Sequence, residues 1–397
     1  SVTKVYAIPG SAAMSDCAEL VGIDWQQSDH LISFLKDNQV DLVVVGPEAP
    51  LVAGLADALN AAGIPVFGPS KAAAQLEGSK VFAKDVMKKF NIPTAAYGVF
   101  HNVDEAKEFI AQTGAPIVVK ADGLAAGKGV VVAMTIEEAN AAVEDMLSGN
   151  RFGEAGSTVV IEEFMEGEEA SLLAFVDGKT VVPMIASQDH KRIFDGDKGP
   201  NTGGMGTYAP APVLTDALRD EAMKTILEPM VGAMQKEGMP YVGCLYAGLM
   251  ITAEGPKVVE FNARFGDPET QVVLPLLDSD LGQIMMACAT GNLTAEMVKW
   301  KDSSAACVIL ASKGYPETSS KGDVIHGDIK QHDTTIVFHS GTKLVGEEYV
   351  TNGGRVLGVV GLGKDLRTAL DRAYGRIEHI NFEGMQYRTD IGAKAFK

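Results

Sequence analysis

Lys120-Ala-Asp-Gly-Leu-Ala-Ala-Gly-Lys-Gly129 combines two lysines with a loop of glycines and other small residues. The apolar run Pro116-Ile-Val-Val119 precedes it and predicts a buried strand, which would hold Lys120 on a fixed platform. Small residues let backbone N–H groups approach phosphate oxygens closely. The segment therefore predicts a strand and loop that bind polyphosphate, with Lys120 and Lys128 as the cations.

This loop is not a P-loop, because no Gly-Lys-Ser/Thr sequence precedes a helix. A glycine-rich turn with a purely structural role is the alternative. The preceding lysine favours phosphate binding over that alternative.

The second informative string is Glu260-Phe-Asn-Ala-Arg-Phe-Gly-Asp-Pro-Glu-Thr-Gln271. Side chains alternate along a strand, so Glu260, Asn262 and Arg264 share one face, and Phe261 and Ala263 point into a core. Glutamate and asparagine oxygens suit Mg²⁺, which takes few protein ligands and keeps substrate phosphates. Arg264 could then offset charge on a transferring phosphoryl group. A solvated edge strand is the alternative.

Between these strings, Ile161-Glu-Glu-Phe-Met-Glu-Gly-Glu-Glu169 holds five glutamates in nine positions. One interpretation is a solvated, charged turn. The other is a hinge whose backbone groups meet an adenine ring and whose glutamate binds ribose hydroxyls.

The chain outside the strings alternates short apolar runs with helical stretches, which predicts an α/β fold that begins with an open parallel sheet. We expect three parts: 1–78 as a substrate domain, 79–300 with a mobile lid at about 97–165, and 301–397 as a small C-terminal α+β domain. The expected strands include Lys4–Ile8 and Asp41–Val45, both buried, then Pro65–Phe67, Ala170–Val176, Leu245–Ile251 and Pro256–Phe261; the expected helices include Ala53–Ala62, Ser79–Phe90 and Thr215–Lys236.

Residues 187–212 are rich in Gly, Asp, Lys and Pro, and we expect no regular structure there. A long structureless segment within a compact domain is usually functional. The favoured interpretation of His190 is a surface residue that forms hydrogen bonds, with catalysis as the alternative.

Composition excludes several classes of protein. The net charge of −18 disfavours a nucleic-acid partner, because binding to phosphates needs a basic face. Four widely spaced cysteines without a Cys-x-x-Cys pair indicate reduced thiols. No apolar run reaches the roughly 18 residues of a membrane span. The chain starts at Ser1, close to an expected strand, and we expect further residues to precede it in the natural protein.

Taken together, the motifs resemble phosphoribosylamine–glycine ligases, the ATP-grasp enzymes of purine biosynthesis. The similarity extends over essentially the whole chain, and its most specific parts are the two strings at 199–206 and 262–271. The motifs that carry it are Leu76-Glu-Gly-Ser-Lys80, Lys120 to Gly129, Ser187-Gln-Asp-His-Lys-Arg192, Gly199-Pro-Asn-Thr-Gly-Gly-Met-Gly206, Glu260 to Gln271, Gly46-Pro-Glu-Ala-Pro-Leu51 and Asn352-Gly-Gly-Arg-Val-Leu357.

The resemblance implies a cytoplasmic enzyme that activates glycine with ATP and joins it to 5-phosphoribosylamine through glycyl phosphate. It implies Mg²⁺, with Mn²⁺ as a substitute, on Glu260 and Asn262, and Arg264 and Lys120 as catalytic residues. ATP would be bound by Lys80, Lys120, Gly123, Gly127, Lys128, Gly129, Glu162, Met165 and Glu169, with Glu168 as the near alternative to Glu169. The other substrates would be bound by Glu48, Pro50, Asp189, Lys191, Asn201, Thr202, Gly203, Gly204, Met205 and Arg264.

The chain also departs from the family pattern. The family's opening Gly-x-Gly-Gly-Arg-Glu-His loop, which helps to hold the substrate phosphate, is not in this sequence. Tyr246-Ala-Gly-Leu-Met250 lacks the acidic metal ligand of the general ATP-grasp pattern. Two alternatives therefore stay open: a truncated protein that binds Mg-ATP without turnover, and an ATP-grasp ligase for another carboxylate. We expect small-molecule partners, no nucleic acid or membrane, and a monomer or weak homo-oligomer.

Overall fold

The computed structural model describes residues 1–125, 129–148 and 150–397. Its N-terminal region contains two separate parallel strand pairs, β1 (Tyr6–Ala7) with β2 (Glu19–Leu20) and β3 (Val43–Val44) with β4 (Val66–Phe67). The prediction of parallel strands is confirmed. The prediction that the first two are buried is wrong, because β1 is half-buried and Val44 is 42% exposed. Each pair is a separate two-stranded sheet, so every one of these strands has a neighbouring strand on one side only.

Short helices surround these pairs. Gly54 adopts a left-handed conformation (φ +97°), which a side chain would disfavour, and it ends one helix and starts the next. The single helix expected over Ala53–Ala62 is therefore shorter and follows a separate one. The helices of this region are α1 (Ser28–Asp37), α2 (Glu48–Ala53), α3 (Leu55–Ala61) and α4 (Gln75–Gly78).

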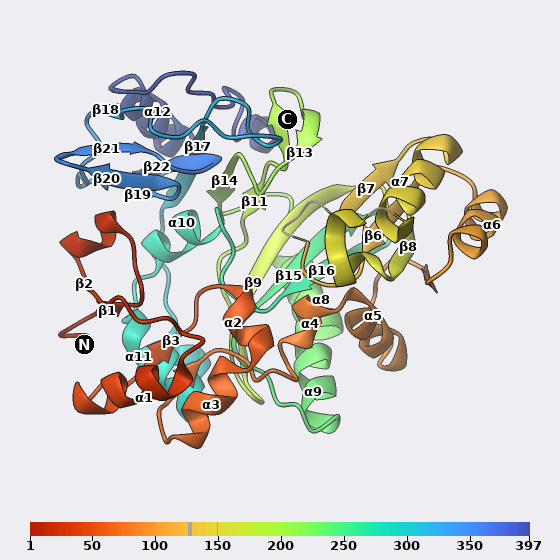
Figure 1. Ribbon diagram of the computed structural model, residues 1–397, viewed down its shortest axis with the longest axis horizontal. Coiled ribbons are helices and arrows are strands. Elements are labelled where there is room, and N and C mark those ends of the chain that lie inside the picture. The colour runs from red at the N-terminus through yellow and green to blue at the C-terminus, as the bar shows by residue number, and fades with distance from the viewer. Residues whose placement is uncertain (126–128, 149) are drawn as a thin grey trace.

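A small antiparallel sheet with its own apolar core projects from the molecule, as Figure 1 shows. Its strand order is β5 (Tyr97–Phe100), β8 (Val159–Glu163), β6 (Ile117–Ala121) and β7 (Val130–Ala133), and α6 (Val103–Thr113) and α7 (Ile136–Ser148) pack on one face. The helix α5 (Lys80–Lys89) leads into it. Ser79 caps α5, since its Oγ accepts a hydrogen bond from the Phe82 N–H (3.1 Å). We call this sheet with α6 and α7 the lid sheet.

A second antiparallel sheet forms the centre of the molecule, in the order β10 (Val181–Pro183), β9 (Glu168–Asp177), β15 (Val242–Thr252) and β16 (Gly255–Asn262). Alternate residues of β9 enter two different cores: Leu172 and Ala174 face one, and Leu173 and Phe175 face the other. This alternation follows from the two-residue period of a strand. Both faces of the sheet are therefore covered.

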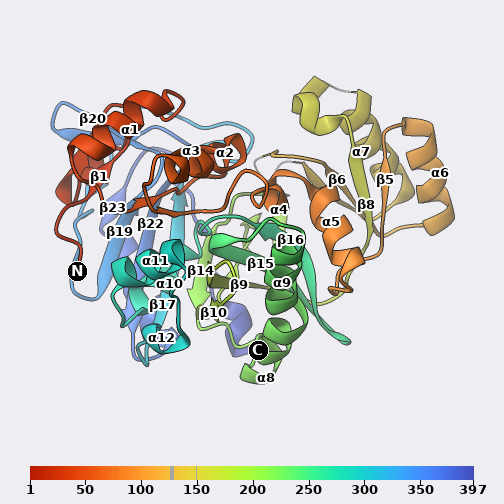
Figure 2. The same cartoon turned by 90° about the horizontal axis from the view of Figure 1, so that it is seen from below.

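Helices cover both faces of this central sheet (Figure 2). The helix expected over Thr215–Lys236 is confirmed as α8 (Asp216–Ala222) and α9 (Glu228–Lys236), joined by a π-helical turn at Met223–Leu227. On the opposite face lie α10 (Thr270–Val273) and α11 (Leu281–Thr290). No helix within residues 1–125, 129–148 and 150–397 is long and apolar enough to cross a membrane.

The third sheet joins the C-terminal region to the middle of the chain. Its order is β11 (Gln188–Asp189), β14 (Gly206–Ala209), β17 (Ser304–Ala311), β22 (Arg355–Gly363) and β19 (Thr335–His339), with α12 (Leu366–Ile377) packed against β22 and β17. Smaller pairs are β12 (Arg192–Phe194) with β13 (Lys198–Asn201), β18 (His326–Gly327) with β23 (Ile380–Asn381), and β20 (Thr342–Val345) with β21 (Glu348–Thr351).

The expectation that residues 187–212 lack regular structure is wrong, because this segment contains β11, β12, β13 and β14. Glycines interrupt the side-chain alternation that would indicate strands in this segment. The structure nevertheless requires glycine at one of these positions, Gly206. A Cβ on Gly206 would lie 2.7 Å from the Cys307 carbonyl oxygen and 2.6 Å from Ile391 Cδ1. Backbone pairing with β17, not side-chain alternation, makes β14 a strand.

Candidate active site

The ammonium groups of two lysines lie close to the carboxylate of one glutamate, between the lid sheet and α5. Lys120 Nζ lies 3.0 Å from Glu162 Oε2, and Lys84 Nζ lies 3.3 Å from the same oxygen. Lys120 on β6 pairs with Val160 on β8, so Glu162 is its diagonal neighbour on the same face. All three side chains are buried. We call them the Lys120–Glu162 cluster.

This cluster has more positive than negative charge. Burial lowers the pKa of Lys84 to about 8, although Glu162 acts in the opposite direction. Burial also lowers the pKa of the nearby Lys80. Glu162 Oε1 is buried and has no hydrogen-bond partner among the residues that the structure describes. An excess of buried ammonium groups suits an anionic ligand, because an anion would stabilise their charged form.

Lys84 was not singled out from the sequence. It follows Lys80 by four residues on one helix, so both side chains point to the same face, and this spacing is the signal that could have identified it. Lys84 Nζ also donates to Thr94 Oγ1 (2.7 Å), whose hydroxyl donates to the Val258 carbonyl oxygen (2.7 Å). The cluster is thereby connected to β16.

The glycine-rich loop begins against the N-terminus of α5. Asp122 Oδ1 accepts hydrogen bonds from the backbone N–H groups of Lys80 (2.6 Å) and Val81 (3.2 Å), and Lys80 Nζ donates to the Gly123 carbonyl oxygen (3.0 Å). At the other end of the loop, the Gly129 carbonyl oxygen accepts from the Ala121 N–H (2.8 Å). The predicted ligands Gly127 and Lys128 lie outside the described residues.

The predicted adenine and ribose residues follow the lid sheet. Met165 is half-buried in the connection from β8 to β9. Glu168 and Glu169 are exposed at the start of β9, and Glu168 Oε2 accepts a hydrogen bond from Gln188 Nε2 (3.1 Å). Glu162 is thus the buried glutamate of this predicted group, whereas Glu168 and Glu169 are exposed and Glu169 lines a cavity.

The strand β16 presents the predicted metal ligands. Phe261 and Ala263 lie in the core, which confirms the expected alternation. Glu260 is exposed and has no ion-pair partner among the described residues, and Asn262 Oδ1 is 3.4 Å from the Arg264 Nη2 donor. A free carboxylate and an amide oxygen two residues apart are hard donors, and Mg²⁺ needs one or two such ligands beside phosphates and water. The pair fits the metal that the family implies.

Arg264 connects this strand to the N-terminal region. Its Nη2 lies 3.0 Å from Glu77 Oε1, and its Nε lies 3.5 Å from Glu48 Oε2. Although burial opposes the charged form, these two carboxylates raise the pKa of Arg264. Glu48 stands at the first turn of α2, and Pro50, which was also predicted to bind substrate, is buried in the same helix. Glu77 is a partner that the sequence did not indicate.

A cavity opens beside β16 on the central sheet. Its lining residues come from β9, β11, β15 and β16 and from Lys191: Glu169, Ala170, Ser171, Asp189, Lys191, Tyr246, Gly248, Val259 and Glu260. The Val259 carbonyl oxygen accepts a hydrogen bond from Lys120 Nζ (3.1 Å). The cavity therefore adjoins the Lys120–Glu162 cluster.

A second group of charges lies along this cavity. Lys191 Nζ is 2.6 Å from Asp189 Oδ2, and this carboxylate helps to raise the pKa of Lys191 against the effect of burial. Glu269, only 1% exposed, accepts hydrogen bonds from Tyr246 OH (2.5 Å) and Ser171 Oγ (3.2 Å). We call these five residues the Lys191–Glu269 cluster. Ser171, Tyr246 and Glu269 were missed, because their partners lie about 20 to 100 residues away.

The loop after β13 lies next to this cluster. The Thr202 N–H and hydroxyl both donate to the Lys191 carbonyl oxygen (2.7 and 2.9 Å). The Gly203 carbonyl oxygen accepts from Arg355 Nη1 (3.0 Å), which also bonds the carbonyl of Asp267. A Cβ on Gly204 would lie 2.6 Å from Pro268 Cδ and 2.7 Å from Asp189 Oδ2, so only glycine fits there. Among the other predicted residues, Met205 is fully buried and Asn201 is exposed.

The expectation that His190 lies on the surface is wrong. The ring is 1% exposed, its Nδ1 lies 2.9 Å from the Gly206 carbonyl oxygen, and its Nε2 lies 3.4 Å from the Gly392 N–H. Burial lowers its pKa to about 4. His190 is therefore a neutral core residue that tethers two backbone segments.

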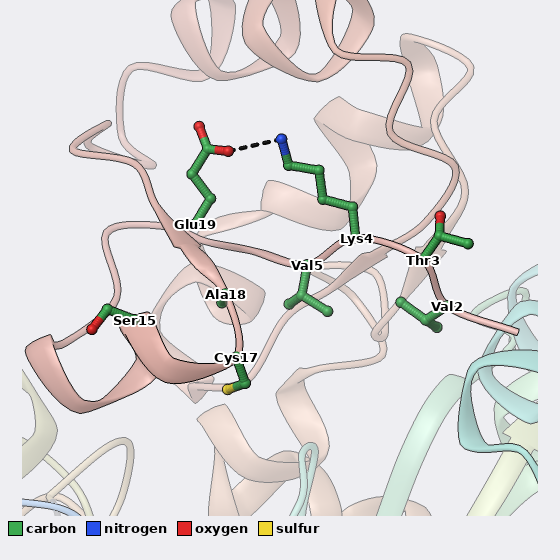
Figure 3. A pocket seen from close by; sticks show the side chains of 8 residues that line it. All are labelled: Val2, Thr3, Lys4, Val5, Ser15, Cys17, Ala18 and Glu19. Carbon is green, nitrogen blue, oxygen red and sulfur yellow. Dashed lines mark ion pairs between the residues drawn. The ribbon is translucent and has the colours of Figure 1, made fainter.

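The depression on the N-terminal face is not a good candidate site. It is lined by Val2, Thr3, Lys4, Val5, Ser15, Cys17, Ala18 and Glu19. Figure 3 shows that its two charged side chains pair with each other, and Lys4 Nζ lies 2.8 Å from Glu19 Oε2. Its charges already neutralise one another, unlike those of the Lys120–Glu162 cluster.

Comparison with known proteins agrees with this geometry over the whole chain. Residues 1–77 match the N domain, 78–270 the ATP-grasp (A) domain and 305–394 the C domain of phosphoribosylglycinamide synthetase. A phosphoribosylamine–glycine ligase from Halalkalibacterium halodurans is 53% identical over 99% of this chain and 92% of its own length. One from Neisseria meningitidis is 52% identical over 99% of this chain and 94% of its length.

Solved structures show the same fold. The crystal structure of a phosphoribosylamine–glycine ligase from Thermotoga maritima aligns with a TM-score of 0.86 at 34% identity and covers 98% of this chain and 94% of that one. A biotin carboxylase from Campylobacter jejuni, at 15% identity, aligns with a TM-score of 0.74 over 97% of this chain and 87% of its own, and shares the fold alone. The chain therefore belongs to the phosphoribosylglycinamide synthetase family, whose members include the phosphoribosylamine–glycine ligases.

Proposed function

We propose that this chain joins glycine to 5-phosphoribosylamine in purine biosynthesis, with ATP converted to ADP and phosphate. The observation that carries the proposal is the similarity, at about half identity and over 99% of the chain, to relatives named for this reaction. The product would be glycinamide ribonucleotide.

The first step is activation of glycine. One carboxylate oxygen attacks the γ-phosphorus of ATP, the bond to ADP breaks, and glycyl phosphate forms. The cation-rich Lys120–Glu162 cluster supports a phosphate site there, with Lys80 and Lys120 on the phosphates and the glycine-rich loop over them, including Gly123, Gly127, Lys128 and Gly129. Glu162 and Met165 would then meet adenine, and Glu169 the ribose.

A divalent cation would be held by Glu260 and Asn262, and the donor set favours Mg²⁺, with Mn²⁺ as a substitute. When bound, it supplies charge neutralisation and alignment for the transferring phosphoryl group. Arg264, fixed by Glu77 and Glu48, would offset the negative charge of the acyl phosphate from the same strand.

The second step is displacement of phosphate. The amine of phosphoribosylamine attacks the acyl carbon, the carbon–oxygen bond to phosphate breaks, and the amine loses a proton as the amide forms. The cavity beside Glu260 supports this placement, because Asp189, Lys191, Ser171 and Tyr246 line it and because one lining residue, Val259, accepts a hydrogen bond from Lys120. We assign Glu48, Pro50, Asp189, Lys191, Asn201, Thr202, Gly203, Gly204 and Met205 to the substrates other than ATP.

We further propose a lid at residues 97–165, between a substrate domain at 1–78 and a C-terminal domain at 301–397. The separate apolar core of the lid sheet supports movement as one body. Closure would keep water from the acyl phosphate. We expect a cytoplasmic monomer or weak homo-oligomer that binds small molecules.

Isotope transfer tests the reaction. With glycine labelled by ¹⁸O in both carboxylate oxygens, we expect one label in each released phosphate and the other in the amide product, because the attacking oxygen leaves with phosphorus. Phosphate release should require glycine and phosphoribosylamine together. Label retained wholly in the product would contradict the acyl phosphate. Equal use of β-alanine would contradict glycine as the substrate, and Mg-ATP binding without turnover would favour a binding protein.

A further inference from the structure

The hairpin formed by β12 and β13 has little support of its own. It is a separate two-stranded sheet, and all four residues of β13 are exposed. Its turn places Gly196 and Asp197 at positive φ (+70° and +54°), a conformation that aspartate tolerates but that is less favourable for it than for glycine. Two-stranded hairpins are marginally stable in water. Contacts from other segments therefore hold it: Ile193 of β12 packs against Met205 and Ala311, and a second segment binds the turn.

The C-terminal tail, residues 386–394, is the segment that binds the turn. Figure 1 shows the C-terminal end of the chain beside β13. Arg388 is 1% exposed and is the largest fully buried side chain among the described residues. Its Nη1 donates to Asp197 Oδ1 (2.9 Å) in the hairpin turn and to the Arg192 carbonyl oxygen (3.1 Å) on β12. One guanidinium thus bonds both the turn and a strand of the hairpin.

The rest of the tail binds the same turn. The Thr389 N–H donates to Asp195 Oδ1 (2.9 Å), and the Gly196 N–H donates to Asp390 Oδ2 (2.9 Å). Lys394 Nζ lies 2.8 Å from Asp197 Oδ2. Every residue of the turn therefore has a partner in the tail.

The charges make this attachment depend on Arg388. Asp390 receives both Nε (2.7 Å) and Nη2 (2.8 Å) of the guanidinium, which is the paired geometry that lysine cannot reproduce. Against the effect of burial, Lys394 and Arg388 lower the pKa of Asp197. Without the guanidinium, Asp390 loses both of its paired donors and Asp197 keeps only Lys394.

The other end of the hairpin reaches the candidate site. β13 continues directly into Thr202, which holds the Lys191 carbonyl oxygen through two hydrogen bonds. Lys191 in turn pairs with Asp189 along the cavity. Four strand residues span about 13 Å, so a displacement of the turn would be transmitted to the loop over a short, hydrogen-bonded ladder.

We propose that Arg388 is a positioning residue for the ligase: it fixes the hairpin so that the Thr202–Gly204 loop and Lys191 keep the geometry in which phosphoribosylamine binds. This inference rests on the proposed function, which assigns the loop to the substrates other than ATP, and it names phosphoribosylamine as the one that the loop binds. A loop already held in its binding conformation loses less entropy when the ligand arrives. The tail therefore holds the substrate site in place although it does not contact the substrate.

The test compares the full-length protein with its Arg388→Gln variant. We expect amide hydrogen exchange at residues 194–204 to become at least about tenfold faster, because local opening no longer breaks the hydrogen bonds from Arg388 to Asp197 and to the Arg192 carbonyl oxygen. Exchange in β9, which lies in the central sheet, should not change. The KM for phosphoribosylamine should rise at least about tenfold, with the Kd for ATP within about twofold of the starting value.

Arg219→Gln is the matched control, because Arg219 also pairs with two aspartates, Asp216 and Asp220, but does so on the surface. It should change none of these quantities. If Arg388→Gln does not fold, the Lys394→Met variant is tested in its place. The Lys394 side chain is 31% exposed, and its replacement removes only the outer ion pair with Asp197. Faster exchange at 194–204 with a two- to threefold higher KM for phosphoribosylamine is then the expected result.

Two outcomes would overturn the proposal. Unchanged exchange at 194–204 would show that the tail does not fix the hairpin. Faster exchange with an unchanged KM for phosphoribosylamine, or with equal changes for ATP, would show that it does not position this substrate. Failure of the proposed function is recognised separately, since the unmodified protein would then release no phosphate in response to glycine and phosphoribosylamine.

Discussion

The two charged clusters of the candidate site differ in sign. The Lys120–Glu162 cluster sets two buried ammonium groups against one carboxylate. The Lys191–Glu269 cluster sets one ammonium group against two carboxylates, supported by the hydroxyls of Tyr246 and Ser171. The first is enclosed between the lid sheet and α5, whereas in the second Lys191 is 37% exposed to the cavity.

Unbalanced charge in a buried place is costly, and a ligand of opposite sign relieves that cost. We infer that the first cluster takes the polyphosphate and that the second faces the amino groups, and not the phosphate, of the other substrates. Burial lowers the pKa of Lys84 in the first cluster and raises the pKa of Glu269 in the second, so in each cluster a nearby group of opposite charge would favour the charged form.

Replacement of Glu260, which lines the cavity together with Lys191 and Asp189, should have the largest effect. The charge of Glu260 also acts on Lys80. Glu260→Gln should lower kcat at least about a hundredfold, because loss of a metal ligand exceeds the 10- to 100-fold effects of its supporting residues. Steady-state rates at saturating Mg²⁺ measure this, and the melting temperature should stay constant because the side chain is exposed.

Glu254→Gln is the control for that substitution. Glu254 lies in the turn before the same strand and pairs only at the surface, with Lys257 (2.6 Å). Its kcat should not change. A Glu260→Gln variant with normal kcat at saturating Mg²⁺ would contradict the metal assignment.

Replacement of Lys120 or of Lys191 by methionine should show which substrate each cluster binds. Lys120→Met should weaken ATP binding by about 10- to 100-fold, the equivalent of the 1.5–3 kcal/mol of a charged hydrogen bond. Lys84 still pairs with Glu162 in that variant, so the fold should persist. Lys191→Met should leave the Kd for ATP within about twofold and raise the KM for glycine or phosphoribosylamine, as calorimetry and steady-state rates would measure.

Lys107→Met is the control here, because Lys107 pairs with Glu144 on the surface of the lid sheet. It should affect neither quantity. The division between the clusters would be refuted if Lys191→Met weakened ATP binding as strongly as Lys120→Met.

The smallest expected effect concerns His190, which must stay neutral beside Lys191. Its folded pKa of about 4 lies below its ordinary value of 6.5, so the folded state binds fewer protons in this range. Its contribution is complete above pH 6.5 and is lost as the pH falls toward 4. Between pH 6.5 and 5.5 the loss should be about 1 kcal/mol of unfolding free energy.

Urea unfolding of the His190→Asn variant measures this contribution, because an asparagine amide can still donate to the Gly206 carbonyl oxygen. The variant should show a weaker pH dependence by that amount. His332→Asn, at an exposed position, is the control and should keep the dependence of the starting protein. Parallel curves for all three proteins would mean that His190 is not the group that titrates.

The sequence predicted the parts of the site that depend on local periodicity. From side-chain alternation, the sequence predicted that Phe261 and Ala263 lie in the core and that Glu260 lies on the opposite face of the strand. The apolar run before Lys120 predicted the strand β6 that supports it. Such features are encoded within a few residues, because the two-residue period of a strand and the small size of glycine act locally.

Only the tertiary structure decided which of these groups meet. Lys84 pairs with Glu162, which is 78 residues away in the sequence. Ser171 donates a hydrogen bond to Glu269, 98 residues away, and Arg388 donates one to Asp197, 191 residues away. The strand β14 exists because its backbone pairs with β17, although its own residues lack a strand pattern. Burial then set the pKa of His190 and Lys84, because desolvation depends on what packs around a group and no short segment contains that information.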